Sequence, residues 1–132
     1  MSRENVEVAL RVIEAINEGD VDGLAAAMAP ECKIVPLRAA LEGTVYSGPH
    51  AAREFWEALV ESWSALHVDL AEVRDLDERV LGLGTLTAKG RGTGAEVETQ
   101  AAFVATIQNG RATELRVYPG HGEALEAVGL RE

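Results

Sequence analysis

Glu98 is the residue of this sequence whose type and position best suit acid–base chemistry. It lies in a stretch from about residue 95 to 108 that predicts a strand, and Gln100 follows two positions later. Side chains two apart on a strand point to the same face. In an apolar enclosure the pKa of Glu98 would rise, so that it could take up a proton near neutral pH while Gln100 held a ligand carbonyl. The alternative is that Glu98 sits near the strand end, in water.

The face on which Glu98 lies depends on the hairpin that follows the strand. Asn109-Gly110 is a strong signal for a two-residue turn into a partner strand at 111–118. If Leu115 and Val117 point inward, this turn assigns to the inner face Thr106, Val104, Ala102, Gln100 and Glu98. The outer face then holds Phe103, Ala105, Ile107, Arg116 and Tyr118. So apolar an outer face favours a homodimer through it, unless the last helix covers part of it.

Further candidates for ligand binding come from other segments. They are Tyr46, Trp56 and His67, together with Gln100 and Val117. The Tyr46 hydroxyl could enter a cavity or simply close the core, and the helical spacing of Trp56 is explained by a core position alone. His67 could titrate near neutrality or be exposed at the start of its strand. The three histidines are far apart in sequence, so we expect no metal and no cofactor.

The elements that would position these residues begin with a pair of helices. Apolar residues recur at helical spacing between 6 and 16, Gly19 can take the left-handed turn that ends a helix, and Asp20 can cap the next one. Pro30 closes this second helix before a strand near residues 33–36. Gly48-Pro49 predicts a third helix, with an inner stripe of Ala52, Phe55, Trp56, Leu59, Val60 and Trp63.

The second half of the chain changes to a period of two. Strands are predicted at 66–74, 79–88, 95–108 and 111–118, and a last short helix at 123–128. Gly82 and Gly84 interrupt one strand, either to allow a bend or to leave room for a ligand. The order of elements predicts an α+β fold, with helices packed on one face of a curved sheet. A single domain spanning residues 1–132 is the simplest organisation.

Composition excludes several classes of function. The net charge of −10 opposes binding to nucleic acid or to anionic membranes. The single cysteine, Cys32, cannot form an internal disulfide, and we find neither a signal peptide nor a membrane-spanning run, so a cytoplasmic location is expected.

The chain resembles the SnoaL-like, polyketide cyclase-like proteins of the nuclear-transport-factor-two-like superfamily. The resemblance rests on the Asn17-Glu18-Gly19-Asp20 break, the Tyr46-Ser47-Gly48-Pro49 segment before Phe55-Trp56, and the Asn109-Gly110-Arg111 turn, and it covers about residues 5–130. It implies a conical curved antiparallel sheet with three N-terminal helices packed on its concave face, a cystatin-like roll. It also implies an apolar pocket between sheet and helices, and often a dimer.

The resemblance does not extend to the known catalytic groups. At the positions that match the isomerase-like members, this chain has Val12, Pro36 and Ala102. At the positions that match the epoxide hydrolases, it has Gly84, Leu86 and Val117. None of these side chains can transfer a proton.

Three functions therefore remain open. The leading hypothesis is a protein that binds a small hydrophobic molecule in an apolar pocket. The second is an enzyme of the isomerase, cyclase or hydrolase type that uses Glu98 as its acid–base group. The third is a dimerising module whose cavity is filled by its own side chains.

Overall fold

The helices of the first half follow the apolar spacing of the sequence. In the computed structural model, which describes residues 2–36 and 44–130, α1 spans Ser2–Glu18, α2 spans Val21–Ala27 and α4 spans Ala51–Ser62. Gly19 ends α1 with a φ of 72°, and the Asp20 carboxylate accepts a hydrogen bond of 2.9 Å from the Gly23 amide. Both the predicted break and the predicted cap are confirmed.

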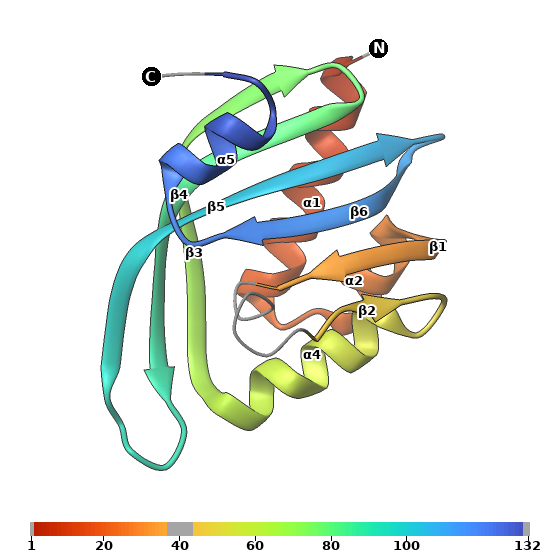
Figure 1. Cartoon of the computed structure of the whole chain (residues 1–132). Helices are drawn as coiled ribbons and strands as arrows, with labels where there is room; N and C mark the ends of the chain where they lie inside the picture. Colours follow the sequence, from red (N-terminus) through yellow and green to blue (C-terminus); the bar gives the residue numbers. More distant parts are fainter. Residues whose placement is uncertain (1, 37–43, 131–132) are drawn as a thin grey trace.

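One six-stranded sheet and a short C-terminal helix form the rest of the described fold. Its strands are β1 (Met28–Val35), β2 (Tyr46–Ser47), β3 (Trp63–Leu76), β4 (Arg79–Gly90), β5 (Glu96–Gln108) and β6 (Arg111–Tyr118). They are ordered β2-β1-β6-β5-β4-β3. Neighbouring strands are antiparallel except for β1 and β6, which are parallel. The predicted α+β fold with a curved sheet is confirmed, and the parallel pair is an addition to it (Figure 1).

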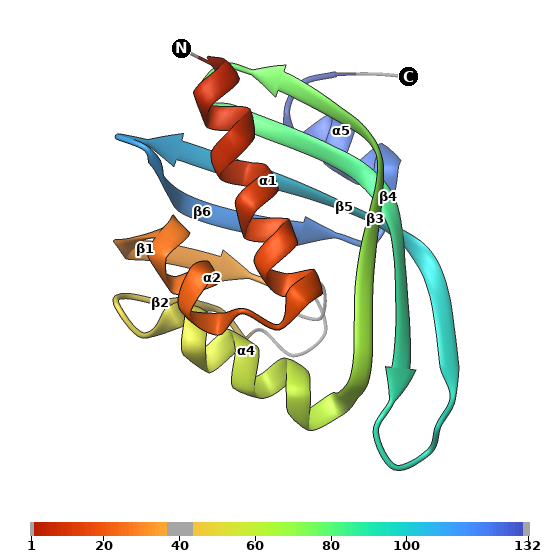
Figure 2. The same cartoon turned by 180° about the vertical axis from the view of Figure 1, so that it is seen from behind.

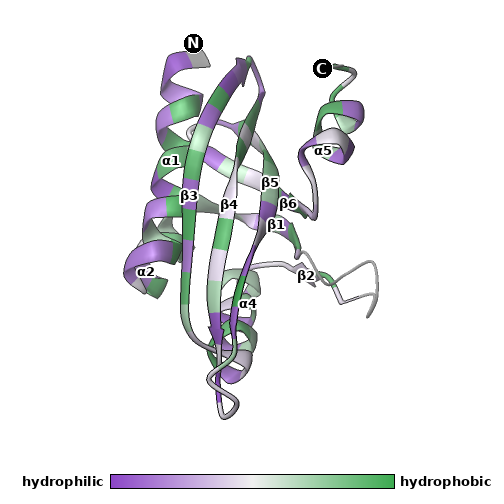
Figure 3. Cartoon of the chain, turned by 90° about the vertical axis from the view of Figure 1, so that its left-hand side faces the viewer, coloured by the Kyte–Doolittle hydropathy of each residue, from purple (hydrophilic) through white to green (hydrophobic). Residues whose placement is uncertain are grey.

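The helices lie on both faces of this sheet. α1 crosses the concave face, with α2 beside it and α4 below (Figure 2). The short α5 (His121–Ala127) lies on the opposite, convex face, as the edge-on view in Figure 3 shows. It covers a small apolar cluster of Leu81, Leu83, Ala102, Val104, Ala124 and Leu125.

The inward and outward residues of β5 differ from the prediction. The turn has the expected form, with φ of 52° at Asn109 and 78° at Gly110, and Ile107 pairs with Ala112. Thr113 is then an extra residue, so the next pair is Thr106 with Glu114. A bulge of this kind moves every later pair by one residue and reverses the faces.

The predicted outer residues of β5 are therefore inner residues. Phe103, Ala105 and Ile107 are buried with Leu115 in the main core, between the sheet and the helices. Ala102 and Val104 lie on the convex face under α5. The inward direction predicted for Leu115 is confirmed, whereas the inward direction predicted for Ala102, Val104 and their alternating neighbours on β5 is wrong.

Candidate functional site

An apolar cavity of about 150 Å³ lies between the helices and the concave face of the sheet. Its walls come from α1, α4 and four of the strands, together with the residue that follows β1. The lining residues are Ile16, Pro36, Phe55, Leu59, Trp63, Leu66, Val68, Leu70, Leu86, Ala101, Ala102, Phe103 and Val117. No ionisable side chain of the described residues lines it.

The amide of Asn17 fixes the end of α1 against the cavity wall. Its Nδ2 donates to the Val68 carbonyl at 2.9 Å, and its Oδ1 accepts from the Val68 amide at 2.8 Å. β3 is an edge strand of the described sheet, so these bonds satisfy backbone groups that would otherwise lack a partner strand. The two hydrogen bonds tie the end of α1 to β3 beside Ile16 and Val68, which both line the cavity.

Gly82 and Gly84 of β4 have structural reasons rather than providing room for a ligand. Gly82 pairs with Phe103, whose ring lies over it, and a Cβ at Gly82 would meet Cζ of that ring at 2.5 Å. A Cβ at Gly84 would collide with the backbone carbonyl oxygen of Asp69. The missing side chains thus admit an aromatic ring and a neighbouring strand.

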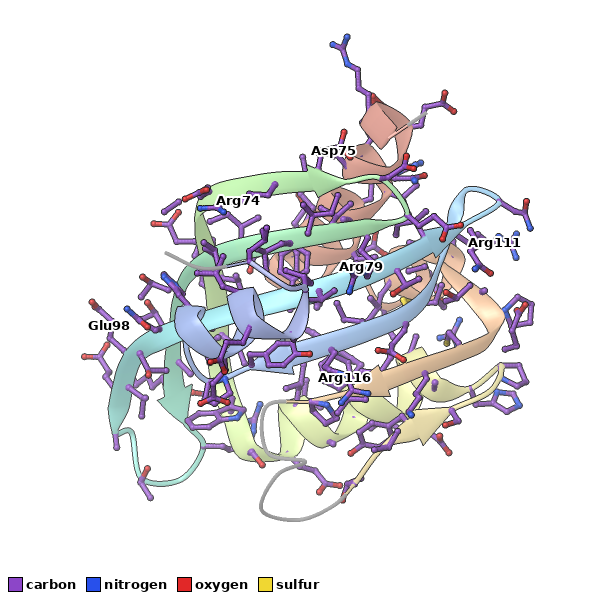
Figure 4. All side chains as sticks on the ribbon, turned by 45° about the horizontal axis from the view of Figure 1, so that its top comes forward. Arg74, Asp75, Arg79, Glu98, Arg111 and Arg116 are labelled. Carbon is purple, nitrogen blue, oxygen red and sulfur yellow. The ribbon has the colours of Figure 1, made fainter. Side chains whose placement is uncertain are left out.

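The predicted acid–base pair does not face the cavity. Glu98 and Gln100 are exposed, and they alternate with Ala102 and Val104 on the convex side of β5. Gln100 Oε1 accepts a hydrogen bond of 3.3 Å from the His121 amide at the start of α5. Figure 4 shows Glu98 at the margin of the sheet. The inward orientation of both residues is a wrong prediction, and its cause is the bulge at Thr113. An exposed carboxylate lacks the apolar surroundings on which the catalytic hypothesis depended.

The other predicted residues are dispersed. Val117 lines the cavity as expected. Tyr46 is half-buried beside Phe55, with ring centroids 6.1 Å apart, and Trp56 lines a neighbouring hollow instead of the cavity. His67 is exposed on β3, since its neighbours Leu66 and Val68 take the inward positions.

Sequence reasoning did not single out the apolar residues of β3 that form much of the wall. Leu66, Val68 and Leu70 alternate along β3, and this period of two in a strand is the signal that could have found them. Phe103 could have been assigned by the same signal, because the odd-numbered positions of β5 are more apolar than the even ones.

Three of the positions matched to catalytic groups in the isomerase-like and epoxide-hydrolase members contribute to the lining: Pro36, Leu86 and Val117. Ala102, another such position, also borders the cavity, although it packs in the convex cluster under α5. None of these side chains carries an acid or a base. Within residues 2–36 and 44–130, no group of three His, Cys, Asp or Glu side chains is placed to hold a metal ion.

Cys32 on β1 is the one nucleophile of the concave side that shows a perturbed pKa among the described residues. It is 2% exposed, and burial raises the pKa of its thiol above the ordinary 9.0. Its Sγ lies 3.7 Å from the Gly48 carbonyl oxygen, and it does not line the cavity. A buried thiol with a raised pKa is a poor nucleophile, so Cys32 acts as a core residue.

Comparison with known proteins agrees with this architecture. The family model of the SnoaL-like domain matches residues 9–115. The chain therefore belongs to the SnoaL-like family of the nuclear-transport-factor-two-like superfamily. A search by sequence among curated proteins found no match.

Solved structures share the fold at low sequence identity. An NTF2-like protein of unknown function from Burkholderia pseudomallei K96243 is 20% identical with a TM-score of 0.79, covering 96% of this chain and 98% of its own. A SnoaL-like polyketide cyclase from Jannaschia sp. CCS1 is 21% identical, with a TM-score of 0.75 and coverages of 88% and 85%. TerC, co-crystallised with polyporic acid, is 20% identical, with a TM-score of 0.76 and coverages of 86% and 89%. At these identities the comparisons establish the fold alone.

Proposed function

We propose that this protein binds a small apolar molecule in the cavity between α1, α4 and the concave face of the sheet. The observation that carries the proposal is the lining, which consists of apolar side chains from both layers of the fold. Transfer of an apolar molecule from water into such surroundings is favourable by about 25 cal/mol for each Å² buried. SnoaL-like relatives include ligand-binding and cyclase-type proteins, which supports the proposal.

The volume indicates a ligand of about one ring. Pockets for drug-sized ligands measure about 300–1,000 Å³, whereas an engineered apolar cavity of about 150 Å³ stays dry and binds benzene. The cavity of this protein, at about 150 Å³, matches the second case. A single aromatic ring or a short branched chain therefore fits, and acid–base catalysis by a described lining residue forms no part of the proposal.

The test is a thermal shift titration with toluene, compared between the native protein and an Ala101→Leu variant. Saturation at 100 times Kd stabilises a protein by about 2.7 kcal/mol, so the native protein should melt several degrees higher. Leu at Ala101 fills part of the cavity and should abolish the shift. Ala26→Leu, at an exposed position of α2, is the control and should keep it. A shift that is equal in all three proteins, or absent in the native protein, contradicts the proposal.

The homodimer stays a prediction, but the apolar outer face from which it was inferred is not present on β5. The apolar residues once assigned to the outer face point to the helices, and α5 covers part of the convex surface. The convex residues beside α5 include Tyr118, Arg116 and Glu114, and Arg116 pairs with Glu114 at 3.3 Å. A convex-face dimer would thus be joined largely by polar groups, and light scattering of Arg116→Glu against the native protein tests it: the variant should be monomeric.

No helix in the described part of the chain has both the length and the hydrophobicity needed to cross a bilayer. The cytoplasmic location inferred from the sequence stays a prediction.

A further inference from the structure

A second hollow, which we call the vestibule, adjoins the apolar cavity. Its volume is about 310 Å³, and Ile16, Leu59, Trp63 and Leu66 line both spaces. Its other lining residues are Asn17, Glu18, Gly19, Trp56, Val60, Ser64, Ala65 and Arg91. Shared walls mean that a ligand held in the cavity can place its outer end in the vestibule. In contrast to the cavity, this hollow is rich in polar groups.

The C-terminal ends of two helices meet at the vestibule. α1 ends at Glu18 and α4 ends at Ser62, on the same side of the molecule (Figure 2). The C-terminus of a helix carries a partial negative charge, and neither helix has a basic residue in its last turn. The Glu18 carboxylate adds a full negative charge, and no described basic side chain forms an ion pair with it.

The chain already places one cation at the end of α4. Arg91 Nε donates to the Val60 carbonyl at 2.6 Å, and its Nη2 donates to the Trp63 carbonyl at 3.4 Å. The guanidinium is thus hydrogen-bonded to carbonyl oxygens at the end of this helix. The end of α4 therefore already has a positive partner, whereas among the described residues the end of α1 and Glu18 have none.

The aromatic side chains of the vestibule also favour a cation. Trp56 and Trp63, both half-buried, line it, and Cζ2 of the Trp56 indole lies 3.6 Å from where a Cβ on Gly19 would be. The indole is therefore next to the end of α1. The faces of indole rings attract organic cations.

From this arrangement we propose that the vestibule receives the ammonium group of a small aryl- or alkylamine whose apolar part occupies the cavity. The inference rests on the proposed function and adds the class of ligand to it. A carboxylate in the same place would face Glu18 and the negative end of α1, while Arg91 is already bonded to the carbonyls at the end of α4, so acids of the same shape should bind more weakly. The affinity for a neutral alcohol should lie between the affinities for the amine and the acid.

The experiment uses phenethylamine, 2-phenylethanol and phenylacetate, which share a phenyl group on a short chain and differ in charge. The two tryptophans of the chain both line the vestibule, and Trp63 lines the cavity as well, so intrinsic fluorescence reports binding in the two spaces and calorimetry gives the affinity. At neutral pH the amine should bind about tenfold more tightly than the alcohol, and phenylacetate should bind more weakly than the alcohol. The advantage of the amine should shrink as salt is raised, because these charges are near solvent.

Glu18→Gln should lower the affinity for the amine about threefold and leave the affinity for the alcohol unchanged. Glu14→Gln is the matched control, since Glu14 is exposed on the same helix and does not line the vestibule. Equal binding of all three compounds, tighter binding of phenylacetate, or equal effects of the two variants would overturn the vestibule inference and leave the proposed function standing. Absence of binding by all three compounds, together with no response to toluene, would overturn both.

Discussion

Replacement of Gly82 by Ala tests the packing of the cavity wall. A Cβ at this position would lie 2.5 Å from Cζ of Phe103 and 2.8 Å from its Cδ2. Carbon atoms in ordinary contact are about 3.5–4.0 Å apart, so the ring has to withdraw by about 1 Å or more. Phe103 lines the cavity, and this space is the direction in which its ring can move.

Overpacking of a core by one methyl group costs about 1–3 kcal/mol, and we expect a loss of stability in this range. The displaced ring also reduces the cavity, so the affinity for toluene should fall about tenfold. Urea unfolding followed by circular dichroism gives the first quantity, and calorimetry gives the second. A lower urea midpoint, with no change in how steeply the free energy of unfolding falls with urea concentration, would assign the loss to the native state.

Two further proteins make this prediction specific. Gly122→Ala is the control, because a Cβ there meets no atom within 4 Å, and its stability should stay within about 0.5 kcal/mol of the native protein or rise slightly. Adding Phe103→Leu to Gly82→Ala relieves the collision, so the double variant should lose at least about 1 kcal/mol less than the sum of the single losses. Additive losses, or a Gly82→Ala protein with unchanged stability and binding, would refute the reasoning.

Three other predictions concern the groups that hold the fold around the cavity. Asn17→Ala removes both hydrogen bonds to the Val68 backbone and should cost about 2 kcal/mol in urea unfolding, and a loss below about 0.5 kcal/mol would show that these bonds contribute little. His121→Ala removes the 2.9 Å hydrogen bond to the Gly84 carbonyl, and it should cost about 1 kcal/mol and lower the hydrogen-exchange protection of α5, whereas unchanged protection would contradict the contact. Burial raises the pKa of Cys32 above 9.0, so the unfolded thiol ionises first; the stabilising contribution is complete below pH 9 and is lost as pH rises through the folded pKa. Relative to Cys32→Ala, the native protein should therefore lose stability above pH 9, and identical pH profiles would contradict this.

Most of the architecture could be predicted from local patterns. Residues close in sequence determine the cap at Asp20, the turn at Asn109-Gly110 and the switch from a helical period to a period of two. They fix the order of elements and hence the fold class. The short helix α5 was also predictable, although its place on the convex face was only one of two alternatives.

The faces of β5 could not be derived from its turn. Register counted from Asn109-Gly110 holds for two residue pairs and then fails at the extra residue Thr113, which no local sequence signal marks. The Thr113 hydroxyl donates to the Thr106 carbonyl at 3.3 Å, across the two strands that the bulge joins. The alternation of apolar residues through Phe103 and Ile107 was the better guide, because burial acts on the whole strand whereas the turn fixes only its end. The assignment of Glu98 to the cavity failed for this reason.

The most direct test of an apolar, ligand-binding cavity is a titration of the native protein with benzene, followed by NMR in carbon–proton correlation spectra of the methyl groups. We predict saturable shifts of the methyl groups of Leu59, Leu66, Leu86 and Val117, which line the cavity, and no shift of Leu125, which is buried under α5 on the opposite face. Spectra that do not change up to the solubility of benzene, or shifts as large at Leu125 as at the cavity residues, would contradict the account.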